Sequence, residues 1–294
     1  MTLNTLPADH ILRQILSLFV ITYVGALLMY FSFAYPSYLF VFDQNHKKHP
    51  KFLKNQVALE IKMSMKALPG IAVMTVPWLL GETTARAAML GPLAPLVEPF
   101  MDGWGYTAVS IVCFLLFTDF GIYWIHRWLH HPLLYKRLHK PHHKWIIPTP
   151  FSSHAFHFMD GYLQSVPYHL FVYMMPMQKY IYLVMFASVN FWSVLIHDGE
   201  YLVSNPVINS AAHHAVHHLY FNYNYGQYLT LWDRIGLSYR KPDASMYDPS
   251  LRMDKTVWKK QAKDVDNFDD NGKPTAASDQ TFKSNAQPKT TKVL

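Results

Sequence analysis

Long apolar runs separated by short polar segments dominate the first two thirds of the chain. The run at 11–42 carries a single charge near its start, and it exceeds the roughly 20 residues that cross a bilayer as a helix. A second run, 63–81, contains one lysine and two prolines, and a third, 107–131, leads directly into a cluster of histidines. The pattern therefore predicts three membrane-spanning helices.

A fourth apolar block, 161–196, is interrupted near its middle by Pro176 and Lys179. Because proline breaks a helix and a lysine is costly inside a bilayer, two helices folded as a hairpin fit this block better than one helix. Glycine and proline are frequent in 81–105, which we expect to be a loop. The sequence thus predicts an all-α integral membrane protein with about four transmembrane helices and a cytosolic, histidine-rich helical cap.

The composition changes abruptly toward the C-terminus, where few residues are able to form a core. We therefore expect three regions: an N-terminal transmembrane region at 1–106, a histidine-containing domain at 107–242, and a polar, disordered tail at 243–294. The N-terminus lacks a basic segment and a small-residue cleavage site, so no cleaved signal peptide is expected.

The overall composition supports a membrane protein. Charged residues make up 15% of the 294 residues and apolar residues 51%, whereas soluble domains carry about 25% charged residues. The net charge of +7 suits loops that face anionic lipid or an acidic partner. We expect no nucleic-acid binding, because the lysines are spread among loops without a binding motif. With one cysteine, Cys113, any metal must be held by nitrogen or oxygen.

The charges of the connecting loops orient the predicted helices. The loop between the first two carries four lysines, and the loop between the second and third carries only Arg86. Because basic loops stay in the cytoplasm, the first loop is expected to be cytoplasmic and the second to lie across the membrane. The third helix then ends on the cytoplasmic side, and the hairpin leaves and returns there. Both histidine clusters are therefore expected on one cytoplasmic face.

Seventeen histidines occur in the chain, and many fall into three closely spaced sets. The first set is HxxxH on a predicted helix, which places two imidazoles on one face. The other two sets are HxxHH, in which we expect the first two histidines to share a face and the third to point toward a second ion. These histidines are His126, His130, His139, His142, His143, His214, His217 and His218.

Eight imidazoles exceed what one ion accepts, so two ions are expected. HExxH is absent, which argues against a zinc peptidase. Imidazole suits iron, zinc, copper and nickel alike, so the residues leave the metal open. They also do not decide between an enzyme and a histidine-rich membrane protein that binds metal without being an enzyme, such as a transporter.

At these histidines the chain resembles the fatty acid hydroxylase superfamily of membrane di-iron enzymes, and within it the sterol C5-desaturases, also called lathosterol oxidases. The likeness covers about 120–240 and rests on HRWLHHPLLYKRLHKPHHKW, SHAFHFMDGYLQSVPYH, IHDGEY and HHAVHHLYFNYNYG. Phe158 departs from the pattern, which has proline after SHAFH. A C4-methylsterol oxidase or another sterol or fatty-acyl hydroxylase of the same superfamily is the alternative.

The resemblance implies an O2-dependent desaturase that removes two hydrogens across C5–C6 of a Δ7-sterol. It implies two non-haem iron ions, although zinc can replace iron in a purified sample. It also implies electrons from cytochrome b5 and NADH-cytochrome b5 reductase, and a place in the endoplasmic reticulum membrane with the active site facing the cytosol. His197 of IHDGEY joins the eight histidines above as a ninth implied ligand. The sterol is expected to arrive sideways from the bilayer, between the third helix and the hairpin.

Several neighbours of the histidine sets are candidates for supporting roles. A side chain that accepts a hydrogen bond from a ligand histidine fixes its orientation, and His154, His157, Asp160 and Asp198 are the candidates. Asp198 is the first choice because it adjoins His197, and the two histidines have loop capping as their alternative role. Four basic residues form a candidate docking surface for an acidic electron carrier, with a solvated, lipid-facing collar as the alternative. They are Lys136, Arg137, Lys140 and Lys144.

Overall fold

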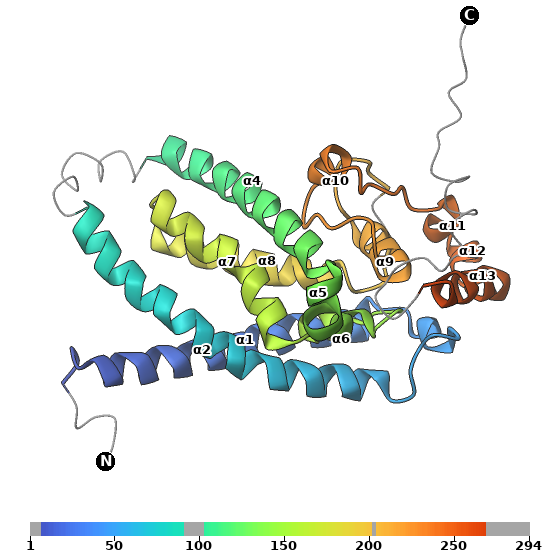
Figure 1. Ribbon diagram of the computed structural model, residues 1–294, viewed down its shortest axis with the longest axis horizontal. Coiled ribbons are helices and arrows are strands. Elements are labelled where there is room, and N and C mark those ends of the chain that lie inside the picture. Colours follow the sequence, from blue (N-terminus) through green and yellow to red (C-terminus); the bar gives the residue numbers. More distant parts are fainter. Residues whose placement is uncertain (1–6, 91–102, 202–203, 269–294) are drawn as a thin grey trace, which may run out of the picture.

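The computed structural model describes residues 7–90, 103–201 and 204–268, and Figure 1 shows their arrangement. Three helices are long and apolar enough to cross a membrane: α1 (Ile11–Phe40), α2 (Gln56–Leu90) and α4 (Trp104–Leu129). Only 6% of the most apolar stretch of α1 is buried, so this helix turns most of its apolar side chains outward, as expected for a helix in contact with lipid. The prediction of an α-helical membrane protein is confirmed.

The second helix is longer than the sequence suggested. The segment 81–105 was expected to be a loop, but α2 continues to Leu90 and α4 begins at Trp104. Pro69 and Pro77 both lie inside α2. In a membrane the backbone has no water to bond to, so a helix persists through residues that would end it in water. Residues 91–102 lie outside the described part of the chain.

The predicted helical hairpin is present. It consists of α7 (Phe158–Met174) and α8 (Lys179–Leu195), and the chain turns between them at the expected break. Each helix has 17 residues, or about 25 Å, and is shorter than the three long helices. Within the bundle α7 contacts both α2 and α4, and α8 contacts α1. The ring of Phe158 lies against Gly70 of α2, where a Cβ would come within 2.7 Å of that ring.

Short helices form a cap at the end of the bundle where α4 ends and α7 begins (Figure 1). The cap contains most of the clustered histidines, which confirms the predicted histidine-rich helical region. Its elements are η2 (Gln44–Lys48), α5 (Pro132–Leu134), the π-helical turn η3 (Tyr135–His139), α6 (Lys140–His143), η4 (Pro150–His154), α9 (Ala211–Tyr220) and α10 (Leu231–Ile235).

The prediction of a disordered tail from residue 243 is wrong for the part that the structure describes. Helices α11 (Ala244–Tyr247), α12 (Pro249–Arg252) and α13 (Lys255–Asp266) occupy it, and α13 packs against α9. Trp258 is buried there, and Asp254 caps α13 by accepting from the backbone of Thr256 and Val257. One large apolar side chain and a good N-cap outweigh the polar composition. Residues 269–294 lie outside the described part.

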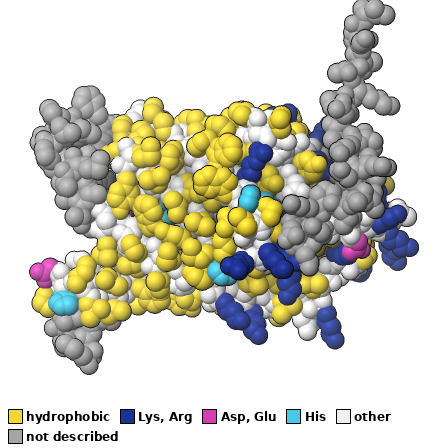
Figure 2. All heavy atoms as spheres, viewed as in Figure 1, with side chains coloured by type: hydrophobic (Ala, Val, Ile, Leu, Met, Phe, Trp, Pro, Cys, Tyr) yellow, Lys and Arg dark blue, Asp and Glu magenta, His cyan; other side chains and the backbone are white. Residues whose placement is uncertain are grey.

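Apolar and basic side chains occupy different parts of the surface. Figure 2 shows hydrophobic side chains covering the face made by the long helices, whereas lysine and arginine gather toward the end that carries the cap. The apolar face suits the interior of a bilayer, and the basic end suits its anionic headgroups. The cap therefore lies at the edge of the apolar band rather than within it.

Candidate metal centre

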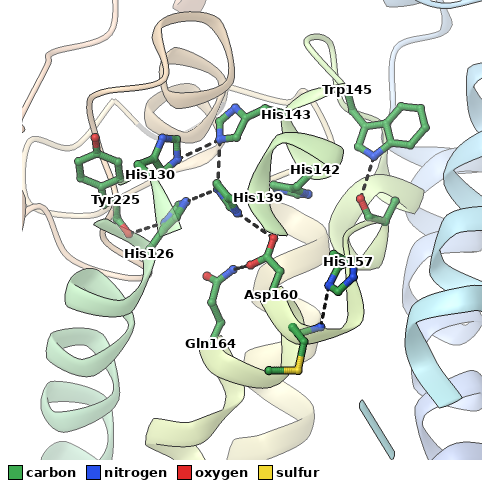
Figure 3. Close-up of polar contacts among 12 residues, drawn as sticks. His126, His130, His139, His142, His143, Trp145, His157, Asp160, Gln164 and Tyr225 are labelled. Atoms are coloured by element: carbon green, nitrogen blue, oxygen red, sulfur yellow. Dashed lines mark hydrogen bonds and ion pairs between the residues drawn. The ribbon is translucent and has the colours of Figure 1, made fainter. Parts of the chain in front are cut away.

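Five histidines from distant parts of the chain meet in one buried group. Their ligand nitrogens all lie within 4.8 Å of one another. Figure 3 shows four of these rings directed toward each other from α4 and the η3–α6 turn, and α9 supplies the fifth. The five-histidine group consists of His126, His130, His139, His143 and His217.

The remaining four of the nine predicted ligands form a second group, again with all four nitrogens within 4.8 Å of one another. The two groups touch, because the rings of His142 and His143 are neighbours in α6 and the rings of His217 and His218 are neighbours in α9. The four-histidine group consists of His142, His197, His214 and His218. The structure thus brings together all nine residues that the sequence singled out, divided five and four.

The division within each HxxHH differs from the expected one. The sequence suggested that the first two histidines share a face, but the first and last do so. His139 and His143 approach each other to 3.1 Å between Nε2 atoms, whereas His142 joins the other group. The third set repeats this, with His214 and His218 also 3.1 Å apart. A helix turns by 100° per residue, so a spacing of four returns closer to the same direction than a spacing of three.

Hydrogen bonds to Nδ1 orient the rings of the five-histidine group. His126 Nδ1 donates to the carbonyl of Tyr225 at 2.9 Å, and His217 Nδ1 to that of Tyr223 at 2.7 Å. His139 Nδ1 donates to Asp160 Oδ2 at 2.7 Å, and both of these side chains are fully buried. Such partners fix the tautomer and leave Nε2 as the free donor of an electron pair.

The Nε2 atoms of this group are arranged as a cation requires. His126 Nε2 and His139 Nε2 lie 3.0 Å apart, and each carries a lone pair because its Nδ1 holds the proton. Two lone pairs at this distance repel unless a positive ion lies between them. Metal–nitrogen bonds of about 2.1 Å that meet at right angles separate two nitrogens by about 3.0 Å. The residues present therefore fit a metal ion.

The four-histidine group shows the same arrangement with different anchors. His197 Nδ1 donates to the Ser193 carbonyl at 2.6 Å, and its Nε2 lies 3.0 Å from His214 Nε2. Burial lowers the pKa of His142 and His214 well below the usual range, and neighbouring imidazoles lower it further. Both rings are therefore neutral at physiological pH, which is the form that binds metal.

The predicted supporting residues have different outcomes. Asp160 holds His139 as expected of an orienting carboxylate, and Gln164 Nε2 in turn donates to Asp160 Oδ1 at 2.7 Å. Asp198 does not orient His197, because both ring nitrogens of that histidine face other groups and Asp198 Oδ1 accepts from the Glu200 backbone. The first choice among the carboxylates was therefore wrong.

The two SHAFH histidines lie outside both groups. His157 caps α7 by accepting from the backbone of Met159 (Figure 3), which is the capping role named as the alternative. His154 contacts Ser153 and Asn190 instead of a clustered histidine. Neither histidine therefore orients a member of the two groups.

Sequence reasoning missed the backbone acceptors. The carbonyls of Ser193, Tyr223 and Tyr225 each hold a clustered histidine. Every residue carries a carbonyl, so no residue type signals this role. The two carboxylate oxygens of Asp233 accept from the backbone of Tyr225 and Gly226 and fix the loop that presents the Tyr223 and Tyr225 carbonyls.

An apolar cavity of about 570 Å³ reaches both groups. Its walls come mainly from α1, α2, α7 and α8, and its inner end includes His126 and His139 of one group and three members of the other. Ile21 and Leu183 line it too, and both are more than half exposed, at 68% and 60%. The cavity therefore meets the lipid-facing surface between α1 and α8. The expected path between the third helix and the hairpin is wrong, since α4 contributes only Ile122 and His126.

The predicted docking residues lie on the cap, beside the five-histidine group. Lys136, Arg137 and Lys144 are exposed, and Lys140 is half-buried. They occupy the η3–α6 segment that supplies three of the nine histidines. A partner that binds this segment would come close to both groups without entering the apolar band.

Comparison with known proteins agrees with this geometry. The fatty acid hydroxylase family model matches residues 111–238. The Delta(7)-sterol 5(6)-desaturase of Eremothecium gossypii is 55% identical over 263 residues, which cover 90% of this chain and 74% of the relative. The enzyme of the same name from Saccharomyces cerevisiae is 49% identical, covering 90% and 72%. That of Schizosaccharomyces pombe is 51% identical, covering 86% and 82%.

No solved structure matches this chain significantly. The similarity to these relatives covers 86–90% of this chain, which is far more than the family model matches. The chain therefore belongs to the fatty acid hydroxylase family, in the subfamily of the Delta(7)-sterol 5(6)-desaturases.

Proposed function

We propose that this chain is a Delta(7)-sterol 5(6)-desaturase, an oxidoreductase that introduces the C5–C6 double bond into a Δ7-sterol. One observation of the structure carries this reading: an apolar cavity, open to the lipid-facing surface, ends at two groups of buried histidines. The identity of 49–55% to relatives of that name supports the choice of reaction. A sterol is almost wholly apolar, so it suits a cavity with these walls.

The nine histidines are proposed to bind two iron ions, one in each group. Imidazole binds iron well, and carboxylate or carbonyl partners at Nδ1 raise the basicity of the ligand nitrogen. When bound, the iron pair supplies the oxidant derived from O2 that a strong, unactivated C–H bond requires. The chain's own contribution is to hold the nitrogens in place and to keep the site dry.

The reaction balances with four electrons. The sterol loses two hydrogens at C5 and C6, which supplies two electrons and two protons. Two further electrons and two protons reduce O2 to two molecules of water. The cavity positions the sterol so that C5 and C6 face His126, His139, His142, His197 and His214, the members of the two groups that line it. Its apolar walls exclude water from the reacting carbons.

Cytochrome b5 is the proposed electron carrier, reduced in turn by NADH-cytochrome b5 reductase. The basic residues of the η3–α6 segment support this choice, because complementary charge speeds the encounter with an acidic carrier. We place the cap on the cytosolic face of the endoplasmic reticulum membrane. The four lysines of the loop between α1 and α2 support that orientation.

Sterol profiling of a cell that lacks C5-desaturase and expresses this chain tests the function directly. Δ5,7-sterols should reappear, and membranes given lathosterol, NADH and O2 should form 7-dehydrocholesterol. A hydroxylated product in place of the diene would favour the hydroxylase alternative and overturn this proposal. The transporter alternative predicts that His142→Ala changes metal flux across the membrane, whereas an enzyme loses sterol conversion with no change in flux.

A further inference from the structure

Polar side chains also line the apolar cavity, and two of them form a hydrogen-bonded pair. His154 of η4 and Asn190 of α8 both line the cavity, and the imidazole Nε2 lies 3.1 Å from the amide Oδ1. The two residues come from different elements, which contact each other. Neither belongs to the five-histidine or the four-histidine group.

The pair keeps an acceptor position for a bound molecule. His154 Nε2 lies at hydrogen-bonding distance from Asn190 Oδ1, 3.1 Å, and His154 Nδ1 lies 3.0 Å from Ser153 Oγ. Asn190 Nδ2 donates to the Phe186 carbonyl at 2.8 Å, which fixes the orientation of the amide and turns Oδ1 toward His154. An amide oxygen has two lone pairs, so Asn190 Oδ1 has a position for a donor from a bound molecule in addition to its contact with His154.

The pair lies about two helical turns from the four-histidine group. Asn190 precedes His197 by seven residues, a spacing that returns to the same side of a helix after about 10 Å. A second polar pair on the cavity wall, His169 Nδ1 and Tyr182 Oη at 3.5 Å, lies much farther away. Tyr182 precedes Asn190 by eight residues, or about 12 Å of helix. The two pairs therefore mark the inner and outer parts of the cavity.

The chemistry of a 3-hydroxysterol distinguishes between these pairs. The hydroxyl oxygen is three bonds from C5 and four bonds from C6, which places it within about 5 Å of the reacting carbons, since each bond is about 1.5 Å long. When C5 and C6 face the histidine groups, the hydroxyl must also be in the inner part of the cavity. His154 and Asn190 meet this requirement, and His169 and Tyr182 do not.

We propose that His154 and Asn190 recognise the 3-hydroxyl of the sterol substrate, which donates a hydrogen bond to Asn190 Oδ1. This inference rests on the proposed function and adds the direction of the substrate: the hydroxyl end enters first, and the side chain of the sterol points toward Ile21 and Leu183 at the lipid-facing end. Anchoring the hydroxyl fixes which ring carbons face the metal-binding histidines. The pair would thereby select both the substrate and the site of desaturation.

The test compares three substrates in the full-length protein: a Δ7-sterol, its 3-deoxy analogue and its 3-keto analogue. Leaving a buried acceptor without its donor costs about tenfold to a hundredfold, so the wild type should prefer the hydroxysterol over the 3-deoxy analogue by that factor in kcat/KM. The ketone offers another acceptor and no donor, so it should be converted more slowly than the 3-deoxy analogue. Dissociation constants of the purified protein for the three sterols should follow the same order.

Two variants assign the preference to the pair. In Asn190→Leu, which preserves volume and removes the acceptor, the ratio between hydroxysterol and 3-deoxy analogue should fall to within about threefold of unity. In His154→Phe, which removes the hydrogen-bond partner of Asn190 Oδ1, the ratio should fall by a smaller factor. Ser188→Ala, an exposed position on the same helix that does not line the cavity, should keep both activity and preference. Tyr182→Phe should keep the preference, and loss of it there instead would mean the opposite direction of the sterol and overturn the proposal.

The outcomes separate this inference from the function on which it rests. A wild type that converts no Δ7-sterol refutes the proposed function. A wild type that converts it while both variants retain the full preference refutes only the recognition site. If neither variant folds, as judged by metal content, the ketone decides the matter in the wild type: conversion equal to that of the hydroxysterol would refute the proposal.

Discussion

The two histidine groups are built from the same residue type but are held differently. In the five-histidine group, three rings are anchored through Nδ1 by the Tyr225 and Tyr223 carbonyls and by the buried carboxylate of Asp160. In the four-histidine group, His197 is anchored by the carbonyl of Ser193. The four-histidine group has fewer anchored rings but faces the cavity more fully. Three of its four rings line the cavity, compared with two of the five rings in the five-histidine group.

This difference suggests a division of labour within the proposed metal pair. The five-histidine group has more donors and a charged partner, which favours tight and permanent binding of an ion. The four-histidine group has fewer donors and faces the substrate cavity, which leaves room for O2 and the reacting carbons. Metal sites with an open position are those that carry out chemistry, whereas closed sites are structural. The predictions below test this contrast.

Removing one ligand from each group should have the largest effect. His139→Ala leaves four histidines in its group, and His142→Ala leaves three. Each substitution should lower sterol conversion by more than about a hundredfold, which is the cost of losing a residue that only orients a ligand. The His142→Ala variant should lose its ion more completely than the His139→Ala variant. Metal analysis of purified protein provides the comparison. Two ions per chain in both variants would contradict the assignment of these residues as ligands.

Neutralising the charged anchor should weaken one group selectively. In Asp160→Asn the amide oxygen still accepts from His139, but the negative charge is lost, so metal affinity of the five-histidine group should fall by about tenfold to a hundredfold. Titration with a chelator should release one ion early and the other at the wild-type concentration. Asp198→Asn is the matched control, because this carboxylate does not orient His197. Equal weakening of both ions would argue against separate anchoring.

Filling the cavity should reduce activity without touching either group. Gly25 lines the cavity, and a Cβ built there has no atom within 4 Å, so the side chain of Gly25→Phe begins without a backbone clash and extends into the cavity. Sterol conversion should fall by about tenfold, mainly through a higher KM, while metal content stays at the wild-type level. Gly105→Phe is the control, because its Cβ also meets no atom and it does not line the cavity. An unchanged KM in Gly25→Phe would place the sterol elsewhere.

Reversing charge on the cap should have the smallest effect. Combining Lys136→Glu with Lys144→Glu should slow reduction by cytochrome b5 about threefold to tenfold, and the loss should shrink at high salt because the contribution is electrostatic. Metal content should not change. Lys259→Glu, an exposed position on α13, provides the comparison. If the double variant loses reduction rate and metal in equal proportion, the surface is structural and does not dock a carrier.

The sequence was sufficient to predict the elements whose signals are local. Apolar runs predicted α1, α4 and the α7–α8 hairpin, and the spacing of histidines predicted eight of the nine members of the two groups. The ninth, His197, was expected only from the family resemblance. The end of α2 was missed, because residues 82–90 were grouped with the glycines and prolines that follow them, although 82–90 contain neither and continue the helix. Helix α13 was missed because its composition is polar, although Asp254 and Trp258 provide a cap and an anchor.

Other features depend on how distant segments meet. Asp160 and Asp198 are both carboxylates close to a histidine set, and nothing in the sequence shows that Asp160 reaches His139 while Asp198 turns to the Glu200 backbone. The path of the cavity depends on contacts between α1 and α8, which are far apart in sequence. The backbone acceptors of the 220–228 loop could not be predicted from residue type.

That loop has a consequence for how its importance would be measured. It turns through Phe221 and Asn224, both at a φ of 57°, and directs the carbonyls of Tyr223 and Tyr225 at two ligand histidines. An alanine scan would remove side chains such as the buried ring of Tyr225, which packs against three of the clustered histidines, and would not test the backbone oxygens themselves. Deleting a single residue from 221–226, or replacing one amide by an ester, would instead rotate or weaken the acceptors. This segment orients the histidines through its length and its backbone path, and both can stay the same when its residue types change.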